Sequence, residues 1–373
     1  MKIVIAPDSF KDSISARDAA HVIADGISSV LGDRAELVCL PIADGGEGTL
    51  DALVPAEARV QTAVCGPLFE PVDAVWGTVG DVAVIEMASA AGLMSVPPSR
   101  RAAMRTTTYG VGELIRLAWS AGYRNIMLTV GGSATNDGGC GMLAALGATF
   151  TNQRGDRFIP TGGTLSEIAS IDLSGARELL ASCRFTVATD VQNPLLGPSG
   201  ATAVYAPQKG ATDDELAEME RGMAHYASLL FAMCGKDIKT RAALGAGGGI
   251  AAPLVAFGNT ELRSGIETVL AVNRFSEALT DATLVITGEG RLDRQSLWGK
   301  TISGVAHAAG ERKIPVHCFV GCLGDPREEL LAMGLADIRE IRTLATSSED
   351  SMKNAARYLF RMARELAERL MLG

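Results

Sequence analysis

Long apolar runs and runs of basic residues are both absent from this sequence. The apolar stretches fall well short of the roughly 18 residues that predict a membrane-spanning helix, so we expect no membrane partner. Lysine and arginine number 34 against 43 aspartates and glutamates, a formal net charge of −9. Without a basic stripe, nucleic-acid binding is not expected. Asp8 comes too early for a secretory signal peptide, which favours a cytoplasmic protein.

Cysteine and histidine are too sparse or too scattered to suggest a metal or redox centre. The seven cysteines fit a reducing compartment, and the pair Cys318 and Cys322 has no second pair to complete a zinc site. The sequence has only four histidines, His21, His225, His307 and His317. They fall on expected helices or a strand, so any catalytic base is expected to be a carboxylate.

Glycine, by contrast, is abundant and clustered. It occupies 42 of the 373 positions, well above the usual level of about 7%. Clusters occur at Gly131-Gly132, Gly138-Gly139 and Gly247-Gly248-Gly249. Such clusters indicate loops in which the backbone comes close to a ligand. The length predicts two or possibly three domains.

Strand and helix patterns alternate along the chain, which predicts an α/β fold with largely parallel sheets. Apolar, β-branched runs predict buried strands at Ile3 to Ala6, Val82 to Met87, Ile126 to Val130, Phe185 to Ala188, Leu284 to Thr287 and Val316 to Val320. Helices are expected after the capping residues Ser15 and Asp18, over Glu113 to Ala121, from Asp213 to Gly235 and over Ser351 to Met371. The stretch from Thr151 to Gly175 is expected to be rich in loops.

The most informative feature is a recurring junction, in which an apolar strand is followed at once by small and acidic residues. It occurs at Ala6 to Lys11, Pro41 to Thr49, Val130 to Gly139, Ala188 to Pro194 and Thr287 to Asp293. In open α/β sheets, ligands bind beyond the carboxyl ends of the strands. Glycine amides bind phosphate oxygens, and carboxylates hold magnesium. The pattern therefore predicts an enzyme acting on a phosphate or another polar small molecule, with Lys11 and Lys209 as mobile positive charges.

The sequence does not match several common nucleotide-binding and catalytic motifs. Gly288-Glu289-Gly290 follows a strand, but Asp293 stands where a dinucleotide-binding fingerprint requires Gly or Ala. A nicotinamide-dependent dehydrogenase is therefore disfavoured. Neither the protein-kinase triplets His-Arg-Asp and Asp-Phe-Gly nor a Gly-x-Ser-x-Gly elbow occurs.

Ordered motifs across nearly the whole chain resemble those of the bacterial glycerate kinase family, type I. They are Ala6-Pro7-Asp8-Ser9-Phe10-Lys11, Ala43-Asp44-Gly45-Gly46-Glu47-Gly48-Thr49, Thr107-Thr108-Tyr109-Gly110, Gly131 to Gly139, Pro207-Gln208-Lys209-Gly210-Ala211 and Ile286-Thr287-Gly288-Glu289-Gly290-Arg291. Several motifs in the same order are far more specific than any single glycine cluster.

The resemblance implies ATP-dependent phosphorylation of D-glycerate to 2-phospho-D-glycerate, as in glycolate, glucarate and galactarate breakdown. It also implies two α/β domains with the active site between them. One is a flavodoxin-like three-layer domain built from residues 1–60 and 286–373. The other is a mixed α/β domain inserted as residues 61–285. We expect a monomer or homodimer that uses ATP and Mg²⁺.

The expected site residues follow from these motifs. Catalysis is assigned to Asp190, which would orient or deprotonate the substrate hydroxyl, and to Lys11 and Lys209. Substrate or nucleotide contacts are expected from Ser9, Asp44, Gly45, Gly46, Glu47, Gly131, Gly132, Ser133, Asn136, Gly288, Gly290 and Arg291. Metal contacts are expected from Asp8, Asp137 and Asp293. The sequence leaves open which lysine faces which anion and whether C2 or C3 is phosphorylated.

Other functions remain to be distinguished. A kinase of another small hydroxy acid, such as tartronate or a longer sugar acid, would carry the same loops. A non-catalytic metabolite sensor could use the same scaffold, although a sensor needs no magnesium ligands.

Overall fold

The computed structural model describes residues 1–294, 301–332 and 334–372. The chain divides into two compact units. The terminal unit comprises Met1–Asp44, Asp51–Pro55 and Ser264–Gly373, and the inserted unit comprises Gly45–Leu50 and Ala56–Arg263. The boundary expected after residue 285 falls within β12 (Ala282–Leu292) of the terminal unit.

The terminal unit is built on a five-stranded sheet in the order β14-β13-β12-β1-β2. Its strands are β1 (Lys2–Pro7), β2 (Glu36–Cys39), β12, β13 (Val316–Leu323) and β14 (Asp337–Glu340). All neighbouring pairs are parallel. Counted along this unit, the order is 2-1-3-4-5, which is the flavodoxin-like order that the resemblance implies.

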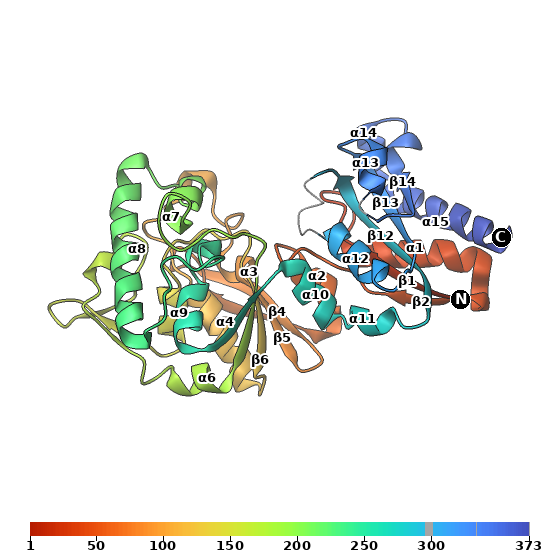
Figure 1. The fold of residues 1–373 in the computed structure, drawn as a ribbon. Helices are drawn as coiled ribbons and strands as arrows, with labels where there is room; N and C mark the ends of the chain where they lie inside the picture. The colour runs from red at the N-terminus through yellow and green to blue at the C-terminus, as the bar shows by residue number, and fades with distance from the viewer. Residues whose placement is uncertain (295–300, 333, 373) are drawn as a thin grey trace. The chain divides into compact units, whose positions relative to one another are not determined.

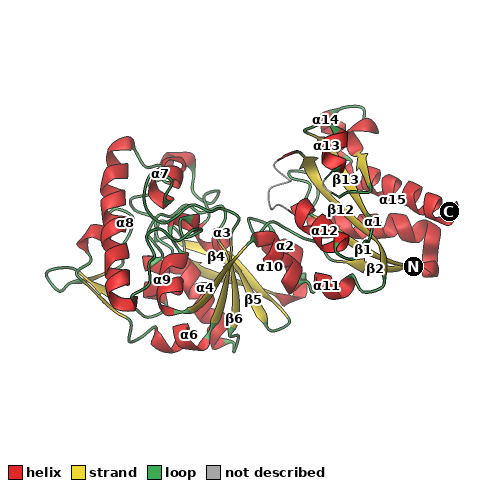
Figure 2. Cartoon of the chain, in the orientation of Figure 1, coloured by secondary structure: helices red, strands yellow, loops and turns green. Residues whose placement is uncertain are grey.

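Helices cover this sheet on both faces (Figures 1 and 2). The helices of this unit are α1 (Ala16–Leu31), α2 (Thr49–Leu53), which begins in the inserted unit, α10 (Gly265–Val272), α11 (Phe275–Ala278), α12 (Thr301–Gly310), α13 (Arg327–Leu331), α14 (Ser348–Lys353) and α15 (Ala355–Leu372). Helices α1 and α15 share one core with Ile3 and Ile5 of β1. Helix α10 packs against α12, where Ile266 lies beside Gly304. This packing places α10 in the terminal unit.

Helix boundaries follow local capping chemistry. The Ser15 hydroxyl accepts a hydrogen bond from the amide of Asp18 at 3.1 Å, as the sequence predicts for the start of α1. The single helix expected over Ser351 to Met371 is wrong, because α14 ends at Lys353 and α15 begins at Ala355. Between them Asn354 leaves the helical conformation, and its side-chain amide donates to the Asp350 carboxylate at 2.8 Å.

The inserted unit contains a six-stranded sheet in the order β11-β10-β6-β5-β4-β3. Its strands are β3 (Arg59–Cys65), β4 (Pro71–Val79), β5 (Val82–Glu86), β6 (Asn125–Thr129), β10 (Arg184–Ala188) and β11 (Asn259–Arg263). Strands β5, β6, β10 and β11 run parallel, whereas β3 and β4 are antiparallel additions at one edge. The carboxyl ends of the four parallel strands therefore share one edge.

The remaining elements of this unit surround that sheet. Its helices are α3 (Met87–Ala91), α4 (Tyr109–Ser120), α5 (Cys140–Ala145), α6 (Arg177–Ser182), α7 (Ala201–Tyr205), α8 (Asp213–Cys234) and α9 (Ala251–Phe257). The loop-rich stretch after Thr151 contributes to a small antiparallel sheet of β7 (Thr149–Thr151), β8 (Arg157–Phe158) and β9 (Ser170–Asp172). Across the described residues of both units, no helix is long and apolar enough to span a membrane.

Candidate active site

In the terminal unit, candidate residues gather where the strand order reverses, between β1 and β12. This switch point is where open α/β sheets bind ligands. The amide of Asp8 donates to the Gly288 carbonyl at 2.8 Å, which joins the loop after β1 to β12. A Cβ built on Gly290 would lie 3.2 Å from the backbone nitrogen of Lys11, so glycine lets the two backbones approach closely.

Asp8 is the most perturbed acid of this group. Its carboxylate accepts hydrogen bonds from the Thr301 hydroxyl at 2.7 Å and from the Ser9 amide at 2.6 Å. Burial raises the pKa of Asp8 to about 6, and the negative charge of Asp44 contributes to the rise. A divalent cation would favour the ionised form of such an acidic pair.

The other expected residues of this unit lie around the same loops. Lys11 and Ser9 are exposed, as is Arg291 at the carboxyl-terminal part of β12. The Arg291 Nε lies 3.6 Å from the Asp293 carboxylate, whose side chain is about one quarter exposed. The exposed side chains of Lys11, Ser9 and Arg291 can reach an incoming anion at little desolvation cost.

In the inserted unit, a second set lies at the carboxyl ends of β5, β6 and β10. Glu86 ends β5, Gly131 to Ser133 follow β6, and Asp190 follows β10. Asp190 is exposed, whereas Ser133 is only 7% exposed. The parallel arrangement of the strands thus brings separate loops to one edge.

Glu86 was not predicted from the sequence, although it organises a predicted loop. Its carboxylate is buried and accepts hydrogen bonds from the amides of Gly48 at 2.8 Å and Leu50 at 3.1 Å. It thereby satisfies amides at the start of α2. An acidic residue that ends an apolar strand was the available signal.

The loop that Glu86 holds lies against the glycine loop after β6. A Cβ built on Gly131 would lie 3.0 Å from the Gly46 Cα, and one built on Gly132 would lie 3.7 Å from a Glu47 carboxylate oxygen. Gly132 also has a φ of 68°, a conformation that favours glycine. The predicted contacts Gly45, Gly46 and Glu47 therefore adjoin the predicted Gly131 and Gly132.

Lys209 is buried beneath this glycine loop. The residue is only 2% exposed. Its amino group lies 2.8 Å from the Ser133 hydroxyl and 2.7 Å from the Thr135 carbonyl oxygen. Burial lowers the pKa of Lys209 to about 7, against the opposing attraction of Asp137. Lys209 is therefore a buried amine whose pKa lies close to neutral pH.

Asp137 does not have the surroundings expected of a metal ligand. One carboxylate oxygen accepts hydrogen bonds from the amide and hydroxyl of Thr108 and from the amide of Gly141, and the other accepts from the amide of Gly139. The residue is completely buried. Protein donors thus occupy this carboxylate, which holds the loop in shape, and the metal contact of Asp137 stays a prediction.

Asn136 is also completely buried, and its amide nitrogen donates to the Thr202 hydroxyl at 3.1 Å. Its amide oxygen has no hydrogen-bond partner. Asn136 thus lies inside the loop that was expected to bind substrate, with one acceptor still available.

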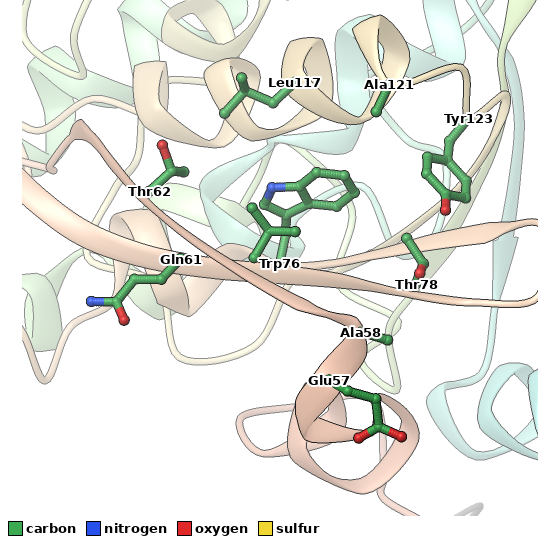
Figure 3. Close-up of a pocket in the computed structure, with 10 residues that line it drawn as sticks. Glu57, Ala58, Gln61, Thr62, Trp76, Thr78, Leu117, Ala121 and Tyr123 are labelled. Atoms are coloured by element: carbon green, nitrogen blue, oxygen red, sulfur yellow. The ribbon is translucent and has the colours of Figure 1, made fainter.

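A pocket of about 530 Å³ lies elsewhere in the inserted unit (Figure 3). Trp76, Leu117 and Tyr123 line it together with residues of β3 and the turn before β3. None of the predicted site residues takes part, so this pocket is not the candidate active site.

The described side chains meet a modest requirement for magnesium. Among residues 1–294, 301–332 and 334–372, no three His, Cys, Asp or Glu side chains converge on one point. Mg²⁺ commonly takes one or two protein carboxylates, with water and substrate phosphates as the other ligands. The neighbouring Asp8 and Asp44 fit that smaller requirement.

Parallel α/β sheets with glycine loops, acids and lysines at their carboxyl ends define a class of protein, the enzymes that handle small anionic substrates. Comparison with known proteins narrows the class. The model of the glycerate kinase family matches residues 3–371. The chain therefore belongs to the glycerate kinase family, whose members are phosphotransferases with an alcohol group as acceptor.

Individual relatives align with this chain over nearly their full length. The chain is 44% identical to a glycerate kinase of Bacillus subtilis (strain 168), covering 100% of this chain and 98% of the relative. It is 42% identical to a glycerate 2-kinase of Escherichia coli (strain K12), covering 100% and 99%. The crystal structure of a provisionally named glycerate kinase 2 from Salmonella typhimurium LT2 matches with a TM-score of 0.90 at 42% identity, covering 100% and 99%.

Proposed function

We propose that this enzyme transfers the γ-phosphoryl group of ATP to the C2 hydroxyl of D-glycerate, giving 2-phospho-D-glycerate. The observation that carries the proposal is the group of glycine loops at the carboxyl edge of the inserted sheet, with Lys209 buried beneath them. The name of the Escherichia coli relative, glycerate 2-kinase, supports C2 as the acceptor.

Phosphoryl transfer asks the protein mainly to position its substrates and to neutralise charge. Asp8 and Asp44 of the terminal unit are proposed to hold Mg²⁺, with Asp293 as a further candidate. Bound there, the ion would neutralise phosphate oxygens. Lys11 and Arg291, which are exposed, would pair with phosphate or carboxylate oxygens.

The inserted unit is proposed to supply the remaining contacts. Backbone amides of Gly131 and Gly132 can approach an anion closely, because glycine has no side chain of its own. Gly45 to Glu47 lie beside that loop, and Glu86 fixes their position. Asp190, exposed at the end of β10, would accept a hydrogen bond from the substrate hydroxyl and orient it.

A substrate panel tests this proposal. With Mg-ATP, release of ADP should depend on D-glycerate, and kcat/KM should be at least about tenfold lower for L-glycerate, tartronate and a six-carbon sugar acid. A preference for one of the other acids would make the enzyme a kinase of that acid. Binding of D-glycerate and Mg-ATP without ADP release would indicate a sensor and contradict the proposal.

A further inference from the structure

Lys209 and Ser133 form a buried pair that the charge-neutralising role does not explain. The two residues are 76 positions apart, yet the Lys209 Nζ lies 2.8 Å from the Ser133 Oγ. Lys209 is 2% exposed and Ser133 is 7% exposed. A lysine that served only to attract phosphate would gain more from an exposed position, because a buried ammonium group loses its hydration.

The surroundings of the Lys209 amine are polar but nearly devoid of charge. Asp137 is the charged group that acts on it, and that carboxylate accepts hydrogen bonds from Thr108, Gly139 and Gly141. Arg101 packs against the neighbouring Gly210. Asp137 therefore favours the protonated form of Lys209 without making a direct salt bridge to it.

The other candidate proton acceptors in the predicted loops of the inserted unit are carboxylates, among them Glu47 and Asp190. None of the four histidines lies in the predicted loops, and Asp190 is exposed to solvent. A serine hydroxyl held by a buried lysine is a known arrangement for activating an oxygen atom. Ser133 is the more exposed residue of the pair, which suits the member that would meet the substrate.

We propose that Ser133 and Lys209 form the proton relay of the reaction, with Ser133 receiving the proton of the acceptor hydroxyl and Lys209 receiving that of Ser133. This inference rests on the proposed kinase function and names its base. It replaces the expectation that the base must be a carboxylate, and it leaves Asp190 the task of orienting the hydroxyl.

The acceptor oxygen forms a bond to the γ-phosphorus while its proton passes to Ser133 Oγ. The original Ser133 proton passes to the neutral Lys209 Nζ, and the bond between the γ-phosphorus and the bridging oxygen breaks. The electron pair of that bond stays on ADP, and Lys209 later returns its proton to solvent. Positive charge thus appears on Lys209 as phosphoryl transfer proceeds, beneath the loop proposed to bind the anion.

The pH dependence of kcat tests the relay. Burial lowers the pKa of Lys209 to about 7, so the amine is neutral and able to accept a proton above that pH. With saturating Mg-ATP and D-glycerate, kcat of the wild type should fall about tenfold per pH unit below pH 7. This decrease is the acidic limb of the pH profile. Ser133→Ala and Lys209→Arg should each lower kcat at pH 8 by about 100-fold and abolish the acidic limb.

Conservative and matched variants separate the relay from a structural role. Ser133→Thr keeps a hydroxyl and should retain the acidic limb. Lys236→Met is the control, since Lys236 also donates to a backbone carbonyl of the inserted unit, that of Val255 at 2.9 Å, and should leave the pH profile unchanged. If Lys209→Arg keeps most of the rate, Lys209 supplies only charge and the proposal fails. The proposal also fails if only Asp190→Asn removes the limb.

A titration without turnover keeps the two proposals separate. The ¹⁵Nζ resonance of Lys209 in the full-length protein, assigned with Lys209→Arg, should titrate near pH 7. Titration near the ordinary lysine value of about 10.4 would overturn the relay even if the kinase is active. Absence of glycerate-dependent ADP release from the wild type would instead overturn the proposed function.

Discussion

At the scale of single residues, buried carboxylates shape the loops that carry the candidate site. Glu86 accepts amide hydrogen bonds from Gly48 and Leu50, and Asp137 accepts them from Thr108, Gly139 and Gly141. Hydrogen bonds to a buried charged acceptor are worth about 1.5–3 kcal/mol each, more than most surface contacts. These acids therefore act on substrate indirectly, through the backbone they hold.

Replacing Glu86 tests this indirect role. Glu86→Gln keeps the size of the side chain but removes its charge and one acceptor, so the loop over residues 45–50 should lose its fixed conformation. We expect kcat/KM for D-glycerate to fall about tenfold, as for the loss of about 1.4 kcal/mol of binding. Steady-state kinetics measures the change.

Glu113→Gln is the matched control for this variant. Glu113 also accepts a backbone amide hydrogen bond in the inserted unit, from Cys65 at 2.7 Å, but it lies outside the loops of the candidate site. It should leave kcat/KM within about twofold of the wild type. Equal losses in both variants would mean that Glu86 acts through general stability alone.

Particular residues show what the sequence can predict of such a site. Gly131, Gly132 and Ser133 were predicted because small residues follow an apolar strand, and that is a local pattern. The contact between Ser133 and Lys209 could not be predicted, because it joins residues 76 positions apart. The role of Asp137 could not be decided from the sequence, because an acid in a glycine-rich loop has the same local pattern whether it binds metal or backbone amides.

At the scale of elements, close packing of α1 on α15 holds the terminal unit together. A Cβ built on Gly26 of α1 would lie 2.6 Å from the Phe360 carbonyl oxygen and 2.7 Å from the Ala363 Cβ. Such distances are too short for ordinary van der Waals contact, so any larger side chain must push the two helices apart.

Gly26→Ala measures how tight this packing is. Alanine gains about 1 kcal/mol of helix propensity, but overpacking costs about 1–3 kcal/mol. We expect a net loss of about 1 kcal/mol in the free energy of unfolding, measured by denaturant titration. Gly310→Ala in α12 is the control, because a Cβ there meets no atom within 4 Å, and it should be neutral or stabilising. A stabilising Gly26→Ala would contradict the account.

The elements also show where sequence patterns are sufficient. Strands such as β1, β5 and β12 were predicted because continuous β-branched runs are typical of buried parallel strands. The antiparallel β3 and β4 were missed, since β3 is an edge strand whose burial is too irregular to give a clear pattern. The break at Asn354 was missed because the run from Ser351 to Met371 contains no glycine or proline and is rich in Ala, Arg, Glu and Leu.

At the scale of the whole molecule, the proposed roles fall in both units. Asp8 and Lys11 belong to the terminal unit, whereas Ser133, Asp190 and Lys209 belong to the inserted unit. The residues proposed for the reaction are therefore drawn from both units. Family membership extends over residues 3–371, which agrees with a function that depends on the full chain.

The central claim is that the enzyme phosphorylates the C2 hydroxyl of D-glycerate with ATP, and an enolase-coupled assay tests it most directly. The assay contains the enzyme, Mg-ATP, D-glycerate and enolase, with phosphoglycerate mutase either present or omitted, and phosphoenolpyruvate is measured. The account predicts that phosphoenolpyruvate forms at the same rate without the mutase, because enolase consumes 2-phosphoglycerate directly. Formation only when the mutase is present would show that C3 is phosphorylated and would contradict the claim.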